Sequence, residues 1–208
     1  MSFSTYEIPK PASEEDVTKY TEIRLSTLST NPEAFGSTYA RESAFTREQW
    51  VARVNTNGRQ TFVAINNDND NWIGTLSVLY PEMLIGGPKS TPYPAEISAA
   101  EEKGELDVLV IFGVWVRPGY RKRGVAQMLV QHTLEAVRQH FTSRPNGETE
   151  PVGEQNPRKQ TILLRVKNDN EAAYSLYEKN GFRKDAGGEE SISSDNDDDE
   201  SWMVCIVE

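Results

Sequence analysis

The chain has 208 residues and a formal net charge of -10; 37% of its residues are hydrophobic and 26% are charged. This length predicts one globular domain with long insertions, and the composition excludes a collagen-like or wholly disordered protein. The longest apolar run, Val108–Val116, includes a glycine and is far shorter than the roughly 20 residues that span a bilayer. The sequence therefore predicts no membrane segment.

The negative charge is concentrated in one segment. Eight acidic residues and no basic residue lie between Asp185 and Glu200, so the rest of the chain is nearly neutral and does not generally attract nucleic acid or an anionic membrane. Cys205 is the single cysteine, and the first residues lack the pattern of a signal peptide. We expect a cytoplasmic protein without disulfides, with a nuclear location left open.

The first half of the chain predicts two helices and an antiparallel hairpin. The expected elements are a strand at Tyr6–Ile8, helices from Ser13 to Asn31 and from Thr46 to Asn57, and strands Thr61–Ile65 and Trp72–Leu79. Ser13 and Thr46 are each followed three residues later by a side chain that can complete a capping box. Segment 81–105 has four prolines and three glycines, which predicts an insertion or lid.

The second half alternates strands and helices. The expected elements are strands Leu106–Val116 and Thr161–Val166, helices Gly124–Phe141 and Glu171–Lys179, and terminal strands Phe182–Lys184 and Trp202–Val207. Two more insertions are expected near 142–160 and 185–201. The almost continuously apolar strand Leu106–Val116 is typical of a strand buried on both faces. The order predicts a mixed α/β sheet in which a single crossover pairs the two most apolar strands in parallel.

The junction between the central strand and the following helix carries the strongest chemical signal. Pro118-Gly119 fits the centre of a type II turn, and Gly124 and Ala126 leave the start of the helix bare. Free backbone N–H groups and the cations of Arg121–Arg123 suit a pyrophosphate, although a solvated basic turn is the alternative. A P-loop does not fit, because Val125-Ala126 replaces its Lys-Ser/Thr, and the dinucleotide fingerprint is absent.

Two segments resemble the GNAT superfamily of N-acetyltransferases. Residues 121–126 match its acyl-CoA signature, Gln/Arg-x-x-Gly-x-Gly/Ala, and residues 170–182 match its Asn-x-x-Ala-x-x-Leu-Tyr-x-x-x-Gly-Phe segment. The resemblance implies a mostly antiparallel mixed sheet with a central parallel strand pair flanked by helices, in one domain over residues 1–208. It also implies transfer of an acetyl group from acetyl-CoA to a primary amine, by direct attack in a ternary complex.

The resemblance further implies where the acyl donor binds. The diphosphate is expected on the amides of Arg121–Ala126, and the pantetheine arm where the strands ending at Val116 and Val166 splay apart. Gly113 is expected to mark a bulge that turns the Val114 N–H toward the thioester carbonyl, where it stabilises an oxyanion. The implied cofactor-binding residues are Val114, Val116, Arg121, Lys122, Arg123, Gly124, Val125, Ala126, Asn170, Ala173 and Tyr177.

Catalysis is assigned by resemblance to Tyr177 and to the backbone of Val114. Tyr177 matches the tyrosine that protonates the departing thiolate in many members, and the alternative is one more core aromatic. Many members carry a glutamate that serves as the general base at the position where this chain has Val110. The general base is therefore open, with Glu105 and Asp107 as the nearest carboxylates. A non-catalytic acyl-CoA-binding module is the alternative function.

The loop of residues 31–39 looks like the acceptor segment of a subset of the family. Phe35 and Tyr39 are expected to line the pocket for a small-molecule or peptide amine, with Glu33 facing a cationic amine; packing under the loop is the alternative. The acceptor's identity is open, and so is a homodimer.

No metal site and no nucleic-acid partner are expected. His132 and His140 lie about 12 Å apart along one helix, so the two alone cannot share an ion within one chain. A metal ion between chains, or one held by a single histidine and carboxylates, stays open. The acidic segment lacks the glycine and glutamate of an EF-hand loop. Nucleic-acid binding through Arg117–Arg123 is disfavoured by the acidic chain.

Overall fold

The computed structural model describes residues 1–84, 93–142, 158–185 and 199–207. Its elements are β1 (Phe3–Glu7), α1 (Glu14–Thr30), the 3-10 helix η1 (Pro32–Ala34), α2 (Tyr39–Ser43), α3 (Arg47–Val54), β2 (Arg59–Asn66), β3 (Asn71–Leu79), α4 (Pro81–Leu84), α5 (Ala95–Glu102), β4 (Leu106–Val116), the 3-10 helix η2 (Pro118–Tyr120), α6 (Val125–Thr142), β5 (Lys159–Lys167), α7 (Glu171–Glu178), β6 (Arg183–Lys184) and β7 (Glu200–Val207).

The strands form a sheet in the order β1-β2-β3-β4-β5-β7-β6. β1–β2, β2–β3, β5–β7 and β6–β7 pair antiparallel. β4 and β5 pair in parallel, with Val108 opposite Thr161 and Val110 opposite Leu163. The predicted fold class is confirmed: a mixed, mostly antiparallel sheet with one parallel pair, flanked by helices.

The chain divides into two compact units. The first contains Met1–Met83 and Ile111–His132, and the second contains Leu84–Val110 and Thr133–Glu208. β4 and α6 each pass from one unit into the other along the chain. The expectation of one domain over residues 1–208 stays a prediction, and the two units are described separately.

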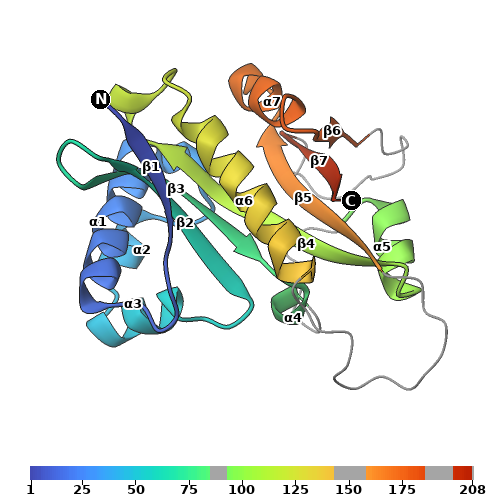
Figure 1. Cartoon of the computed structure of the whole chain (residues 1–208), viewed down its shortest axis with the longest axis horizontal. Helices are drawn as coiled ribbons and strands as arrows, with labels where there is room; N and C mark the ends of the chain where they lie inside the picture. Colours follow the sequence, from blue (N-terminus) through green and yellow to red (C-terminus); the bar gives the residue numbers. More distant parts are fainter. Residues whose placement is uncertain (85–92, 143–157, 186–198, 208) are drawn as a thin grey trace. The chain divides into compact units, whose positions relative to one another are not determined.

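In the first unit, helices cover both faces of the hairpin formed by β2 and β3. Alternation along a strand places Phe62 and Val63 on opposite faces. The Phe62 ring lies 5.5 Å from the His132 ring of α6, whereas Val63 belongs to a cluster with residues of α1 and α3. Figure 1 shows α1, α2 and α3 grouped beside β1–β3. Because both faces are covered, β2 is buried along most of its length.

The predicted helix starts are confirmed. Ser13 accepts the Asp16 N–H and Asp16 accepts the Ser13 N–H, so the capping box of α1 is complete. Thr46 and Gln49 form the same reciprocal pair at the start of α3. Each box satisfies two backbone donors that the first helical turn leaves without partners.

The second unit has its own apolar cluster. Tyr93, Val108 and Leu163 form its buried centre, and Trp202 packs against them. The Tyr93 and Trp202 rings meet edge to face at 5.8 Å. These contacts join Tyr93, which precedes α5, to β4, β5 and β7 through side chains.

The insertions were only partly predicted. Segment 81–105 contains helices α4 and α5, which sequence reasoning missed because the four prolines and three glycines of the segment pointed to an insertion without regular structure. Most of the insertions near 142–160 and 185–201 lies outside the described residues. The short helix α2 was also missed, since five residues are too few to show a helical period.

Candidate functional site

The turn before α6 differs from the sequence prediction. A type II turn requires a positive φ at Gly119, whereas the left-handed residues are Lys122 (φ 59°) and Gly124 (φ 81°). Pro118–Tyr120 instead form a 3-10 turn in which the Tyr120 N–H donates to the Arg117 carbonyl at 2.9 Å. The type II prediction is therefore wrong, and the backbone freedom of glycine is used at Gly124.

The start of α6 is bare, as predicted. The first helical hydrogen bond joins the Met128 N–H to the Gly124 carbonyl at 2.9 Å, so the N–H groups of Val125, Ala126 and Gln127 have no intrahelical acceptor. A Cβ added at Gly124 would meet no atom within 4 Å. A helix N-terminus with N–H groups that lack intrahelical acceptors, next to a glycine with open space beside it, suits an anionic group such as a diphosphate.

The three basic residues of the turn have different roles. The Arg121 side chain donates to the Val116 carbonyl at 2.9 Å and to Asn31 Oδ1 at 2.6 Å. These two hydrogen bonds hold the turn to the end of β4 and to the end of α1. Lys122 and Arg123 are exposed, and the Arg123 guanidinium lies 6.0 Å from the Tyr120 ring. Lys122 and Arg123 are therefore the side chains in this turn that are best placed to add positive charge near the N-terminus of α6.

Sequence reasoning missed Asn31, the residue that ends α1. Its Oδ1 accepts hydrogen bonds from both the Trp115 indole, at 3.1 Å, and the Arg121 guanidinium. These partners are 84 and 90 residues away in the chain. No local sequence signal reports contacts over such separations.

β4 contains the expected irregularity at Gly113. Its φ is +67°, and a Cβ there would meet no atom within 4 Å. A left-handed residue inside a strand redirects the neighbouring backbone groups. Val114, which follows, is partly buried, and Val116 is buried. The role of the Val114 N–H stays a prediction.

The second motif lies in the second unit. Asn170 is the N-cap of α7, and its side chain accepts the Ala173 N–H at 3.1 Å. Tyr177 is buried and packs edge to face on Phe182 at 5.7 Å. Burial raises the pKa of the Tyr177 hydroxyl well above its ordinary value. The capping alternative for Asn170 is confirmed, while the acyl-donor contacts of these residues stay predictions.

The predicted site residues are therefore divided between the units. Val114, Val116 and the 121–126 segment belong to the first unit, and Asn170, Ala173 and Tyr177 belong to the second. The splayed cleft that would bring them together stays a prediction.

The predicted acceptor residues all lie in the first unit. Glu33 is exposed on η1 and accepts a hydrogen bond from Asn31 at 3.2 Å. Phe35 packs against the apolar cluster, below the Arg24 guanidinium at 5.4 Å. Tyr39 starts α2 and is 48% exposed. The packing alternative is confirmed for Phe35, and the acceptor roles stay predictions.

The candidate carboxylates near the start of β4 differ in their surroundings. Asp107 forms an ion pair with Arg158 at 3.4 Å, and Glu105 is exposed. Val110 is partly buried where many members of the resembled family have a glutamate. Neither carboxylate has a feature that marks it as the general base.

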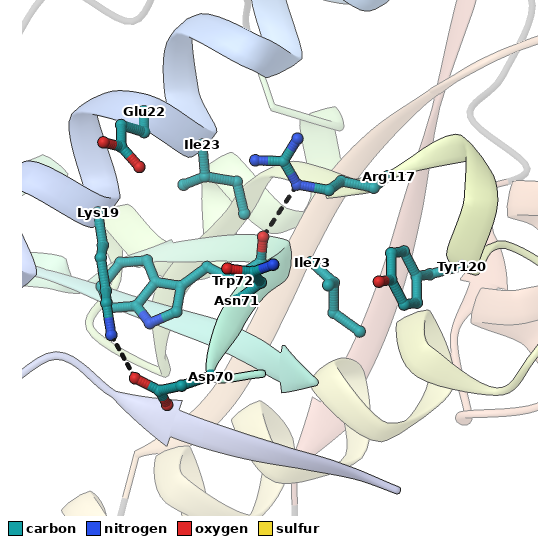
Figure 2. A pocket seen from close by; sticks show the side chains of 9 residues that line it. All are labelled: Lys19, Glu22, Ile23, Asp70, Asn71, Trp72, Ile73, Arg117 and Tyr120. Atoms are coloured by element: carbon teal, nitrogen blue, oxygen red, sulfur yellow. Dashed lines mark hydrogen bonds and ion pairs between the residues drawn. The ribbon is translucent and has the colours of Figure 1, made fainter. Parts of the chain in front are cut away.

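A pocket of about 290 Å³ lies in the first unit (Figure 2). Its lining residues are Lys19, Glu22, Ile23, Asp70, Asn71, Trp72, Ile73, Arg117 and Tyr120. Lys19 pairs with Asp70 at 2.6 Å, and Arg117 donates to the Trp72 carbonyl at 3.0 Å. None of the predicted site residues lines this pocket, and two of its cations already have partners, so we assign it no role in acyl transfer.

In the described part of the chain, none of the helices combines the length and the apolar character needed to traverse a bilayer. Over the same residues, no three His, Cys, Asp or Glu side chains gather as a metal site would require.

Comparison with known proteins identifies the family. Residues 49–184, more than half of the chain, match the family model described as an acetyltransferase (GNAT) domain. The chain belongs to this family. No curated protein matches it.

Solved structures share the fold at low sequence identity. A GNAT-family acetyltransferase from Streptococcus pneumoniae has 15% identity and a TM-score of 0.61, with 100% of both chains covered. Arabidopsis thaliana NAA60 in complex with a bisubstrate analogue has 17% identity and a TM-score of 0.55, again with 100% of both covered. PaiA N-acetyltransferase from Thermoplasma acidophilum in complex with coenzyme A has 14% identity and a TM-score of 0.52, with 99% of both covered.

Proposed function

We propose that this protein transfers an acetyl group from acetyl-CoA to a primary amine of a small molecule or peptide. The observation that carries the proposal is the bare start of α6, where the first three N–H groups have no intrahelical acceptor and a Cβ at Gly124 would meet no atom within 4 Å. Membership of the GNAT family supports acyl transfer. The complexes of NAA60 with a bisubstrate analogue and of PaiA with coenzyme A support acyl-CoA as the donor.

The first unit supplies the proposed binding groups for the donor. The N–H groups of Val125, Ala126 and Gln127 donate to the diphosphate, and the partial positive charge of the helix start attracts it. Lys122 and Arg123 add full charges from an exposed position. Arg121 acts indirectly, because its guanidinium holds the turn in place.

The thioester supplies an electrophilic carbonyl carbon and a thiol leaving group. The acceptor nitrogen, once it has lost a proton to become a neutral amine, forms the new C–N bond as the C–S bond breaks. Its surplus proton passes to solvent, and the sulfur leaves as a thiolate that solvent then protonates. In this proposal the Val114 N–H stabilises the negative charge that develops on the carbonyl oxygen. The Tyr177 hydroxyl donates a hydrogen bond to the departing sulfur, and the raised pKa keeps that donor protonated.

The matched variants Gly124→Glu and Gly124→Ala test the diphosphate site. Both place a side chain at a left-handed residue, so both carry the same backbone strain. The glutamate alone adds a negative charge beside the proposed diphosphate. We expect Gly124→Glu to lose acetyl-CoA binding, measured by calorimetry, while Gly124→Ala retains it. Undiminished binding by folded Gly124→Glu would contradict the diphosphate assignment.

A non-catalytic acyl-CoA-binding module is the second candidate function. It is favoured by the valine at position 110, because many family members carry at this position a glutamate that serves as the general base. Free thiol release from acetyl-CoA, measured across a panel of amines, separates the two. Amine-dependent thiol release supports the enzyme, whereas acetyl-CoA binding without release by any amine supports the module.

A further inference from the structure

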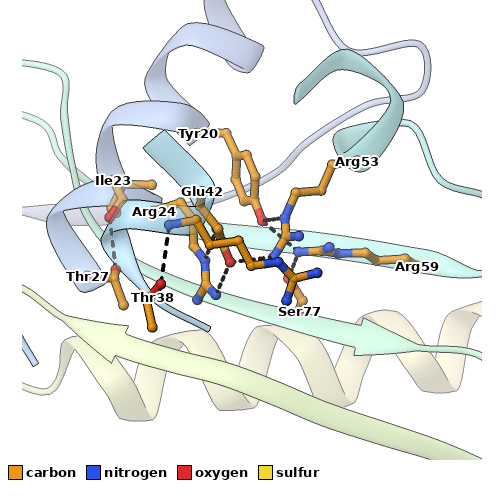
Figure 3. Close-up of polar contacts among 10 residues, drawn as sticks. Tyr20, Ile23, Arg24, Thr27, Thr38, Glu42, Arg53, Arg59 and Ser77 are labelled. Atoms are coloured by element: carbon orange, nitrogen blue, oxygen red, sulfur yellow. Dashed lines mark hydrogen bonds and ion pairs between the residues drawn. The ribbon is translucent and has the colours of Figure 1, made fainter. Parts of the chain in front are cut away.

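Three arginines surround one buried carboxylate in the first unit (Figure 3). Arg24 of α1 makes a two-pronged contact with Glu42 of α2, with Nε and Nη2 at 2.8 and 2.7 Å from its two oxygens. Arg53 of α3 reaches the same carboxylate at 3.4 Å. Arg59, the first residue of β2, donates to the Tyr20 hydroxyl at 2.6 Å and to the Ser77 hydroxyl at 3.3 Å, beside the other two. We call Arg24, Arg53 and Arg59 the arginine cluster.

The positive charge of the arginine cluster is not balanced. Within the described residues, Glu42 is the one carboxylate that pairs with any of the three guanidinium groups, which leaves two positive charges in excess. Arg59 is only 7% exposed, and its Nε is buried without a hydrogen-bond partner. An arginine remains charged in a protein, so a buried guanidinium with an unused donor carries a desolvation cost.

The neighbours of Arg59 add to the imbalance. The ammonium group of Lys10 donates to the Arg59 carbonyl, which brings a fourth cation close, although the carboxylates of Glu82 and Glu7 offset part of its charge. Burial, together with the charge of Arg59, lowers the pKa of Lys10. Burial and the charges of Arg53 and Arg24 lower the pKa of Arg59, although Tyr20 opposes this change. Burial is the larger cause of both shifts, and a bound anion would oppose the repulsion that adds to it.

The arginine cluster adjoins the residues that the proposed reaction uses. The Arg24 guanidinium lies 5.4 Å from the ring of Phe35, in the predicted acceptor loop. The Arg59 guanidinium lies 5.1 Å from the ring of Phe112. Phe112 precedes Val114 by two residues, so their Cα atoms are at most about 7 Å apart. Between them, Gly113 borders open space.

We propose that the arginine cluster binds an oxyanion, a carboxylate or a phosphate, carried by the acceptor amine. This inference rests on the proposed function and adds the chemical class of the acceptor. A guanidinium presents donors in a planar fork that fits both anions, and the unused Nε of Arg59 is one such donor. The side chains of Arg24 and Arg53 are 12% and 26% exposed, so solvent reaches the cluster only at its edge, on their side.

Matched acceptors test this class directly. Free amino acids are compared with their amides, and phosphoethanolamine with ethanolamine, in the thiol-release assay. We expect kcat/KM to be at least about tenfold higher for the anionic member of one pair or both, and the pair that responds identifies carboxylate or phosphate as the anion. Equal or faster transfer to the neutral members of both pairs would overturn the inference.

Variants separate binding of the anion from a structural role of the cluster. Arg59→Gln should raise KM for the anionic acceptor at least about tenfold and leave the neutral acceptor's kcat/KM and the KM for acetyl-CoA nearly unchanged. Arg47→Gln is the control, since Arg47 is an exposed arginine of α3 that pairs with Glu14. A purely structural role predicts equal losses for charged and neutral acceptors in Arg59→Gln, and that result would contradict the proposal.

A binding measurement covers the case in which Arg59→Gln does not fold. Malonate or inorganic phosphate should raise the Tm of the full chain above that in chloride of equal ionic strength, and Arg53→Gln should reduce the increase. No increase with either anion would overturn the inference. A Tm increase without acetyl transfer to any amine would keep the anion site and refute the proposed function. Acetyl transfer restricted to neutral amines would keep the proposed function and refute the anion site.

Discussion

Tyr177 has the environment that a stable hydrogen-bond donor requires. It is 6% exposed, and burial raises the pKa of its hydroxyl, so the phenol keeps its proton at every pH in which the protein would be assayed. A thiol has an ordinary pKa near 8.5, so full proton transfer from this phenol to a thiolate is uphill. The proposed contribution is therefore a hydrogen bond to the developing charge, with solvent supplying the final proton.

Tyr177→Phe tests that role. The ring and its edge contact with Phe182 are retained, so we expect an unchanged Tm and acetyl-CoA affinity but a kcat lowered roughly 100-fold. The loss should be the same from pH 6 to pH 9, because the hydroxyl does not titrate in that range. Steady-state kinetics across pH measure it.

Tyr174→Phe is the matched control for this variant. Tyr174 lies on the same helix, and its hydroxyl donates to Asn168 at 3.2 Å. Its removal should leave kcat within about twofold of the native value. An unchanged kcat in Tyr177→Phe at saturating substrates would exclude the tyrosine from the reaction.

The distance between helix α6 and the sheet depends on a glycine in β3. A Cβ at Gly74 would lie 3.1 Å from the Leu129 side chain and 3.2 Å from the Trp115 carbonyl oxygen. Both distances are tighter than ordinary carbon contacts. Close approach at this point positions the first half of α6, which also carries the proposed diphosphate donors.

Gly74→Ala should therefore affect both stability and binding. Moving α6 outward to accept the methyl group costs about 1–3 kcal/mol of unfolding free energy, and it displaces the donors of Val125 and Ala126. We expect a Kd for acetyl-CoA raised several-fold, measured by calorimetry, and a lower denaturation midpoint. Gly36→Ala is the control, because a Cβ there meets no atom within 4 Å. Native stability and affinity in Gly74→Ala would show that the contact does not set the position of α6.

For the whole molecule, the dependence of stability on pH should be dominated at the acid end by Glu42. Burial alone would raise the pKa of this carboxyl, but the hydrogen bonds and charge of Arg24, with the charge of Arg53, lower it below the ordinary value. A group whose pKa is lower in the folded state binds its proton more tightly when unfolded. Its stabilising contribution is therefore present above pH 4.5 and is lost as the pH falls below that value.

Glu42→Gln should remove this contribution and leave Arg24 without its partner. Breaking one side of a buried pair costs about 3–5 kcal/mol, so we expect that loss in urea unfolding at pH 7 and a flatter dependence on pH below 4.5. Glu14→Gln, which breaks the exposed pair with Arg47, should change stability by less than about 1 kcal/mol. Equal stability of Glu42→Gln and the native chain at pH 7 would contradict this account.

The sequence predicted features that short-range patterns encode and missed those that tertiary contacts create. Capping boxes, the apolar stripe of α6 and the bare glycine before it are all local, and the structure contains them. The bracing of Arg121 by Asn31 depends on residues 90 positions apart. The arginine cluster joins α1, α2, α3 and β2, and its charge balance appears only when these elements meet. The prediction of a type II turn was wrong because Lys122, rather than Gly119, takes a left-handed conformation.

One amide oxygen, that of Asn31, ties together the last turn of α1, the indole of β4 and the turn that precedes α6. These three segments consequently share one contact, and fraying at the end of the first helix removes a hydrogen bond from each of the other two. Amide hydrogen exchange should show the backbone around Trp115 and Arg121 losing protection together, at a denaturant concentration below that of global unfolding.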